Sequence, residues 1–234
     1  YYLLRNEGKT FEILSGKDQI IFVRKIIQQL RLKGLSIGMV LREISLAKNN
    51  LITVDEFKAL YEGDRTMLKV ADVYESYDRE KEKRLLLDFD DLLMHAYKLL
   101  RENKEVRDKY RSTFRHLLVD EFQDTNPIQM AILKILISNN GEDSSFWVCG
   151  DDWQSIYAFT GASVGNILNF KKLFPEATQF ILTLNYRSTP QILRACHNLI
   201  QHNVKKIDKE LKTLNPDGED IVVLESSKVR VLQL

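Results

Sequence analysis

Between about residues 18 and 111, apolar residues recur three or four positions apart, which is the spacing of one buried helix face. Two such stripes comprise Ile20, Ile21, Val23, Ile26, Ile27 and Leu30, followed by Val40, Leu41, Ile44 and Ala47. The segment Thr53-Val54-Asp55-Glu56 has the sequence of a capping box, and Asp88 can begin another helix that carries Phe89 and Leu92. This region is therefore predicted to be almost wholly helical.

A run of charged residues at positions 78–84 falls inside this helical region. Its sequence, Asp-Arg-Glu-Lys-Glu-Lys-Arg, mixes both signs at helical spacing. We interpret the run as a solvated helix face, and an edge that contacts phosphate groups is the alternative.

The pattern changes after residue 112, where short apolar runs alternate with helical segments. The runs occupy residues 116–119, 146–149 and 179–184, and Pro127 and Pro190 open two of the helices. This alternation predicts an α/β fold with a parallel, doubly wound sheet. Polar residues follow each run, namely Asp120-Glu121, Gly150-Asp151-Asp152 and Asn185-Tyr186-Arg187. Because ligands bind at the carboxyl ends of such strands, a binding site is predicted there.

Composition narrows the class of protein only slightly. With 34 basic and 33 acidic residues the net charge is +1, so total charge gives no argument for nucleic-acid binding, although a local basic groove stays compatible with it. Cys149 and Cys196 lie in apolar stretches without metal-ligand spacing, which predicts buried free thiols in a reducing compartment. No apolar run approaches the roughly 20 residues of a membrane span, so a cytoplasmic protein is expected.

The acid pair Asp120-Glu121 follows four apolar residues, as in the Walker B segment of a nucleotide hydrolase. One carboxylate of such a pair holds Mg²⁺ at the terminal phosphates, and the next orients or deprotonates the attacking water. This assigns the metal to Asp120 and the role of base to Glu121. The alternative is that Asp120 caps the next segment and Glu121 is merely exposed.

Gln154, Tyr157 and Phe159 follow the second run. A Gln amide can donate a hydrogen bond to a γ-phosphate oxygen and accept one from water, so Gln154 suits the detection of intact ATP. It could equally be a turn residue. The two aromatic rings could stack on the bases of a single strand. Ordinary packing is the alternative for both rings.

Tyr186 and Arg187 follow the third run, just before a helix. An Arg in this place can neutralise charge on a transferring phosphoryl group, and the adjacent Tyr can stack on a base. A surface salt bridge is the simpler explanation of Arg187.

In combination, three segments resemble the second, third and fourth motifs of superfamily 1 helicases of the UvrD/Rep type. They are VDEFQDT at residues 119–125, GDDWQSIYAFTGA at residues 150–162 and LNYRST at residues 184–189. The Asp-Asp-Trp-Gln sequence in the second of them is closer to the helicase IV branch. The segment LDFDDLL at residues 87–93 resembles the return from the helical insertion of that family.

The resemblance implies an α/β fold with a partial RecA-like parallel sheet and an inserted all-helical subdomain. The insertion would cover residues 1–86, including the end of a preceding RecA-like helix. Residues 87–203 would form the latter part of the first RecA-like ATPase domain, and residues 204–234 the start of the second.

The resemblance also implies ATP and Mg²⁺ as cofactors, and single-stranded DNA and its junctions with duplex DNA as partners, with movement from 3′ to 5′. The implied roles are Mg²⁺ binding by Asp120 with Glu121, water activation by Glu121, recognition of the γ-phosphate by Gln154 and Arg187, adenine stacking by Tyr186, and base stacking by Tyr157 and Phe159.

The sequence departs from the family pattern in two places. Ala158 and Thr160 stand where family members often carry a basic residue and an Arg. The phosphate-binding loop GxxxxGK[ST] is missing, because Gly8-Lys9-Thr10 has Leu3 at the position of the first glycine. We interpret Gly8-Lys9-Thr10 as a turn and expect a fragment of a longer helicase that hydrolyses little or no ATP by itself.

Two other interpretations stay open. The chain could belong to a non-catalytic helicase-like subunit that binds DNA or a partner protein, or to another P-loop ATPase that acts on protein or RNA. An intact GxxxxGK[ST] upstream would distinguish a motor from a binding subunit. Tyr157 and Phe159 weigh against the second alternative.

Overall fold

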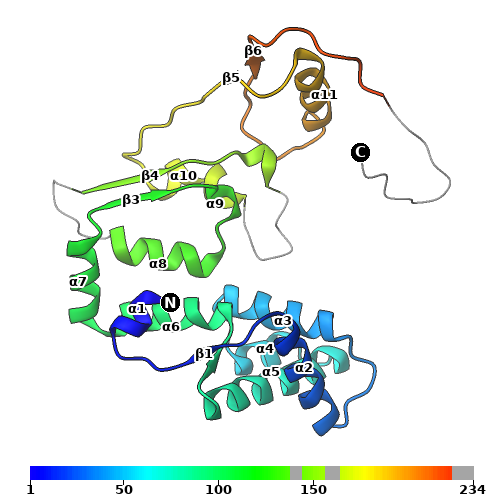
Figure 1. The fold of residues 1–234 in the computed structure, drawn as a ribbon, viewed down its shortest axis with the longest axis vertical. Coiled ribbons are helices and arrows are strands. Elements are labelled where there is room, and N and C mark those ends of the chain that lie inside the picture. Colours follow the sequence, from blue (N-terminus) through cyan, green and yellow to red (C-terminus); the bar gives the residue numbers. More distant parts are fainter. Residues whose placement is uncertain (138–143, 156–163, 223–234) are drawn as a thin grey trace. The chain divides into compact units, whose positions relative to one another are not determined.

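The computed structural model describes residues 1–137, 144–155 and 164–222, and the chain divides into two compact units, Tyr1–Ile167 and Leu168–Leu234 (Figure 1). Both units contain helices and short parallel strands. The predicted domain boundaries after residues 86 and 203 stay predictions.

The first unit is mainly helical, as the apolar spacing predicts. Its α-helices are α1 (Tyr2–Asn6), α2 (Gly16–Gln29), α3 (Ile37–Asn49), α4 (Val54–Leu60), α5 (Arg65–Lys83), α6 (Phe89–Glu102), α7 (Lys104–Thr113) and α8 (Pro127–Ile137), with α9 (Gly165–Leu168) at the boundary of the unit. Figure 1 shows α2 to α5 gathered together, with α6 and α8 between them and the strands β3 (His116–Val119) and β4 (Ser145–Val148).

Helices α2 to α5 pack around one hydrophobic core, to which the predicted apolar stripes contribute residues. Its fully buried members include Val23, Val40, Val70, Val73 and Tyr77. Part of the first stripe is wrong, because Ile20 and Ile21 are 40% and 45% exposed. The helix turns its Val23 and Ile26 side inward instead.

Both predicted helix starts are confirmed, and each of them is a capping box. Thr53 Oγ1 accepts the Glu56 N–H at 3.3 Å, and Glu56 Oε2 accepts the Thr53 N–H at 2.8 Å. At the start of α6, Asp88 Oδ1 accepts the Asp91 N–H at 2.8 Å and Asp91 Oδ2 accepts the Asp88 N–H at 2.9 Å. Both boxes satisfy backbone donors that a helix otherwise leaves unpaired.

The charged run at residues 78–84 is not a wholly solvated face, so this prediction is wrong in part. Lys81 is 2% exposed, and so is Lys48 on α3. Lys48 Nζ lies 3.1 Å from Asp88 and 2.5 Å from Asp91, and Lys81 Nζ lies 2.8 Å from Asp88. Lys81 also pairs with Asp91, and both ammonium groups pair with Asp78 at 3.0 and 3.2 Å. These two lysines and three aspartates form the buried ion cluster, which joins α3, α5 and the start of α6.

Three pairs of parallel strands complete the described fold. β1 (Glu12–Ile13) pairs with β2 (Leu86–Leu87), and β3 pairs with β4 in the register His116 with Ser145 to Val119 with Val148. The predicted strand at residues 116–119 is confirmed, and the strand predicted at residues 146–149 begins one residue earlier. The parallel direction is confirmed as well.

The second unit contains α10 (Phe170–Leu173), α11 (Pro190–Ile200) and the parallel pair β5 (Leu184–Asn185) and β6 (Lys212–Thr213). The predicted helix start at Pro190 is confirmed. The strand predicted at residues 179–184 is wrong, because only Leu184 of this run is in a strand. Thr183 O accepts the Lys212 N–H at 2.8 Å, but residues 179–183 are not in a strand, so the apolar run alone did not determine one.

The prediction that both cysteine thiols are buried is wrong. Cys149, directly after β4, and Cys196, on α11, are exposed and free. Their apolar sequence neighbours do not cover them, because one lies at a strand end and the other on the outer side of a helix. Among the described residues, no helix has both the length and the apolar character that a membrane crossing requires.

Candidate functional site

The acid pair lies at the carboxyl end of β3, as predicted, and Glu121 has an unusual backbone. Glu121 has φ of 50° and ψ of 42°, which is the left-handed region that residues with a side chain rarely adopt. Its N–H donates to Asp120 Oδ1 at 2.9 Å, and both side chains are exposed. Strained backbone of this kind is concentrated at functional sites, because the surrounding structure must hold it in place.

Gln123 connects the ends of β3 and β4. Its Nε2 donates to Glu121 Oε2 at 2.7 Å, and its Oε1 accepts the Asp151 N–H at 2.9 Å. Gln123 is 1% exposed, so its end of both hydrogen bonds is buried, although the Glu121 side chain is exposed. This residue therefore orients the Glu121 carboxylate. We did not single out Gln123 from the sequence, because only the pairing of β3 with β4 brings its two partners together.

The backbone of the two strand ends is held by further bonds. The Cys149 N–H donates to Val119 O at 2.8 Å, and the Phe122 N–H donates to Cys149 O at 2.9 Å. These bonds continue the parallel ladder past Val119 and into the turn that carries Glu121. The strained turn is thus fixed on both sides.

Gly150 allows the close approach of these two ends. A Cβ at this position would lie 2.6 Å from Gln123 Oε1 and 3.1 Å from the Phe122 backbone nitrogen. Gly150→Ala is therefore expected to lower the free energy of unfolding by about 1–3 kcal/mol, because Gln123 or the backbone must move. Urea denaturation followed by circular dichroism measures this change.

The matched control is Gly38→Ala. A Cβ on Gly38 would meet nothing closer than Ser36 Oγ at 3.9 Å, and Gly38 lies in α3. This replacement is expected to be neutral or stabilising by up to about 1 kcal/mol. Equal stability of Gly150→Ala and the unaltered protein would show that the position of Gln123 does not require a residue without a Cβ at position 150.

Gln154 is connected to the same turn through Asp151. Gln154 Nε2 donates to Asp151 Oδ2 at 2.8 Å, and the Asp151 N–H donates to Gln123 Oε1. The Gln154 side chain is exposed. Three predicted site residues, Asp120, Glu121 and Gln154, therefore belong to one hydrogen-bonded group around the ends of β3 and β4.

Asp124 is a fourth acid close to this group. Its Oδ1 is buried and accepts no hydrogen bond from the part of the chain that the structure describes. Burial and the negative charge of Glu121 raise the pKa of the Asp124 carboxyl above its usual value. A buried acceptor without a donor next to Asp120 and Glu121 gives the turn unused oxygen-ligand capacity.

The atoms at this turn that could bind a metal ion are carboxylate oxygens, which suit a hard divalent cation such as Mg²⁺. Within the described residues there is no group of three or more His, Cys, Asp or Glu side chains arranged to enclose a metal ion. Mg²⁺ at phosphate-transfer sites commonly takes one or two carboxylates, with water and phosphate oxygens as its other ligands. The residues present fit that kind of site.

Tyr186 and Arg187 belong to the second unit, where their backbone is held firmly. Asn185 Oδ1 accepts the N–H groups of Arg187 at 3.0 Å and Ser188 at 2.7 Å. Asn215 Nδ2 donates to the carbonyl oxygens of Tyr186 at 3.1 Å and Ser188 at 3.2 Å. The Tyr186 ring is 78% exposed and the Arg187 side chain is exposed too, so both are accessible to a ligand.

Tyr157 and Phe159 lie outside the described residues, and their roles stay predictions. The turn predicted at Gly8-Lys9-Thr10 is confirmed at Gly8, which ends a turn after α1, and Lys9 and Thr10 follow without regular structure. Gly8 has φ of 79°, and its N–H donates to Arg5 O at 3.0 Å at the end of α1. This glycine therefore terminates a helix, whereas a phosphate-binding glycine precedes one.

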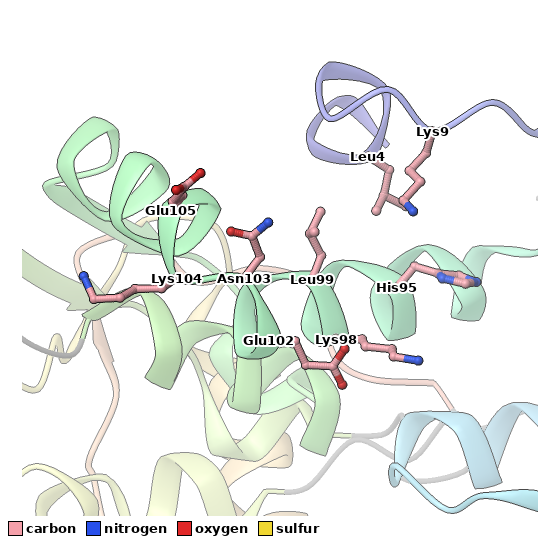
Figure 2. Close-up of a pocket in the computed structure, with 9 residues that line it drawn as sticks. All are labelled: Leu4, Lys9, His95, Lys98, Leu99, Glu102, Asn103, Lys104 and Glu105. Atoms are coloured by element: carbon pink, nitrogen blue, oxygen red, sulfur yellow. The ribbon is translucent and has the colours of Figure 1, made fainter.

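A pocket of about 690 Å³ lies elsewhere in the first unit, between the N-terminal segment and α6. Figure 2 shows Leu4 and Lys9 facing the helix that carries His95 and Leu99. The remaining lining residues are Lys98, Glu102, Asn103, Lys104 and Glu105. None of them is a predicted site residue, and the mixture of lysine and glutamate side chains favours neither anions nor cations.

Helices around short parallel strand pairs, with acids at the carboxyl end of one strand, define a partial RecA-like α/β fold. Comparison with known proteins agrees with this class. The family model of the UvrD/REP helicase N-terminal domain matches residues 2–175. The chain belongs to this helicase family.

Among the relatives, the ATP-dependent DNA helicase PcrA of Bacillus subtilis (strain 168) is 38% identical over 213 residues, covering 90% of this chain and 28% of the relative. The PcrA of Staphylococcus aureus (strain Mu50) is 36% identical over 225 residues, covering 95% of this chain and 30% of the relative. The PcrA of Leuconostoc citreum is 35% identical over 227 residues, with 94% and 30% covered. The chain thus spans less than a third of the length of these relatives.

Proposed function

We propose that this chain is part of an ATP-dependent DNA helicase that couples hydrolysis of Mg²⁺-ATP to movement from 3′ to 5′ on single-stranded DNA. The observation that carries the proposal is the turn after β3. There Glu121 is held in a left-handed conformation, and Gln123 fixes its carboxylate. The names of the PcrA relatives and the family match support the same activity.

In this proposal Asp120, with Glu121, would hold Mg²⁺, and the bound ion would supply positive charge for the terminal phosphates. Glu121 accepts a proton from the attacking water, and the hydrogen bond from Gln123 leaves Glu121 Oε1 for that task. Gln154 donates to the γ-phosphate. Arg187 contacts the developing negative charge, and Tyr186 stacks on adenine; their exposure leaves both side chains available.

The chain by itself is expected to hydrolyse little or no ATP. Its Gly8-Lys9-Thr10 turn lacks the first glycine of a phosphate-binding loop, and without that loop nothing cradles the phosphates against Asp120 and Glu121. The activity is therefore a property of the full-length protein.

ATP hydrolysis by the full-length protein, with and without single-stranded DNA, tests the proposed function. Turnover that requires Mg²⁺ and rises with DNA would support a DNA-driven motor. DNA binding without any turnover would favour the alternative, a non-catalytic helicase-like subunit. Stimulation by RNA but not by DNA would favour a P-loop ATPase of another kind.

Single-strand binding is a separate prediction, which rests on the sequence of the segment around Phe159. Phe159→Ala in the full-length protein is expected to weaken binding of single-stranded DNA by about 1–3 kcal/mol, because one stacking platform is lost. Fluorescence anisotropy with a labelled oligonucleotide measures the affinity, and thermal unfolding is the control. Unchanged DNA affinity, or a large drop in thermal stability, would identify Phe159 as a packing residue.

A further inference from the structure

The last turn of α3 carries two adjacent buried polar residues, Lys48 and Asn49, with 2% and 5% exposure. Lys48 belongs to the buried ion cluster, so its ammonium group fixes this turn against the start of α6 through Asp88 and Asp91. Asn49 Nδ2 also reaches α6, donating to Asp90 Oδ1 at 3.1 Å. The end of α3 is therefore fixed to α6 by two neighbouring side chains.

The other half of the Asn49 amide points to a different element. Asn49 Oδ1 accepts a hydrogen bond from Asn126 Nδ2 at 2.9 Å, across 77 positions of sequence. Asn126 is 8% exposed, so this bond between two amides is shielded from water. It is a directional connection between α3 and the residue that precedes α8.

Asn126 also caps α8. Its Oδ1 accepts the Gln129 N–H at 3.0 Å, and its own N–H donates to Gln129 Oε1 at 3.0 Å. Asn126 is separated from Glu121 by the short 3₁₀ helix Phe122–Asp124 and Thr125. The Thr125 carbonyl is held as well, by Asn166 Nδ2 at 2.8 Å. The segment with the strained Glu121 thus ends at a side chain that α3 holds.

We propose that Asn49 is a positioning residue for ATP hydrolysis, acting on Glu121 through its hydrogen bond to Asn126. The inference rests on the proposed function and adds a connection from the helical part of the unit to the turn after β3. Asn49 fixes the far end of the Glu121 segment, while β4 and Gln123 fix the near end. Without Asn49, the segment keeps its residues and its bonds to Gln129 and Asn166, but it loses the hydrogen bond that connects its far end to α3.

The test compares steady-state kinetics of Asn49→Ala and the unaltered full-length protein. Asn49→Ala is expected to lower kcat for ATP by about 10-fold and to change KM for ATP less than about 2-fold, because a small displacement of a reacting group slows turnover without removing nucleotide contacts. Hydrogen exchange of backbone amides 120–126 is expected to become faster in the same variant.

Asn49→Asp separates positioning from general structural damage. This replacement keeps an oxygen that accepts the hydrogen bond from Asn126 Nδ2. It also removes the hydrogen bond that Asn49 donates to Asp90 and places a second negative charge beside that carboxylate. It is expected to destabilise the protein yet to keep kcat within about 2-fold of the unaltered value. A structural role alone would make this variant at least as inactive as Asn49→Ala.

Asn50→Ala is the matched control, because Asn50 is exposed and its side chain donates to Leu46 O of its own helix at 2.8 Å. It is expected to leave kcat and amide exchange unchanged. Two outcomes would overturn this inference and leave the proposed function intact. One is an Asn49→Ala variant that turns over ATP as fast as the unaltered protein, and the other is an Asn49→Asp variant that loses as much kcat as Asn49→Ala. No turnover by the unaltered protein would overturn the proposed function and the inference together.

Discussion

Glu121→Gln in the full-length protein is expected to lower DNA-stimulated ATP turnover by about 100- to 10 000-fold while nucleotide binding is retained. A Gln side chain has nearly the same shape as Glu, but it cannot accept the proton of the attacking water. Gln123 can still bond to the amide oxygen at position 121, so the turn after β3 keeps its geometry. A release assay for phosphate and the binding of a fluorescent ATP analogue measure the two quantities.

Glu62→Gln is the control for this replacement. Glu62 is exposed on the helical part of the first unit, and the same chemical change there is expected to leave turnover unaltered. Normal turnover by Glu121→Gln would remove Glu121 from the role of base. Loss of nucleotide binding together with turnover would indicate that its main task is to hold the metal or the fold of the turn.

Lys48→Met is expected to lower the free energy of unfolding by about 3–5 kcal/mol. The replacement removes one of two ammonium groups from the buried ion cluster and leaves Asp88 and Asp91 short of positive charge. Uncompensated charge in the interior costs far more than an exposed ion pair contributes. Urea denaturation near neutral pH measures the loss.

The dependence of stability on pH checks the same cluster. Burial alone would raise the pKa of Asp88, but the charges of Lys48 and Lys81 outweigh it and hold that pKa well below its usual value of 3.8. Asp88 therefore contributes stability that is present above about pH 3.8 and is lost as the pH falls toward its lowered pKa. For Lys48, burial alone would lower the pKa, but the three aspartates raise it above 10.5, so its contribution is present below that pH and lost above it.

These directions predict a difference between Lys48→Met and the unaltered protein that is large at neutral pH and shrinks as Asp88 becomes protonated at low pH. Lys83→Met is the matched control, because Lys83 is 60% exposed and pairs with Glu80 on the same helix. Its loss is expected to stay below about 1 kcal/mol. Equal stability of the two variants would show that the cluster carboxylates do not depend on Lys48.

Local features of the fold could be predicted from the sequence because a few neighbouring residues determine them. Thr53 with Glu56 and Asp88 with Asp91 form capping boxes from side chains only three positions apart. The run His116–Val119 is bounded by polar residues and gives β3 its full length. The same boundary between apolar and polar residues predicts the position of the acid pair at the end of β3.

Features that depend on distant partners could not be predicted in this way. Lys81 resembles its solvated neighbours in the charged run, and only the approach of α3 and α6 makes its burial possible. Residues 179–183 have the apolar character of a strand, but the parallel pair of β5 with β6 begins only at Leu184. Gln123 looks like one more polar turn residue until β4 places the Asp151 N–H beside it.

The left-handed backbone of Glu121 has a consequence for the evolution of this protein. Glycine adopts that conformation without strain, and so would relieve it, but glycine has no carboxylate. Selection for heat resistance alone would therefore favour loss of this glutamate, whereas selection for turnover retains it. Thermostable variants obtained without a screen for activity should be sequenced at this codon first, because Glu121→Gly would relieve the strain and remove the proposed catalytic base in one mutation.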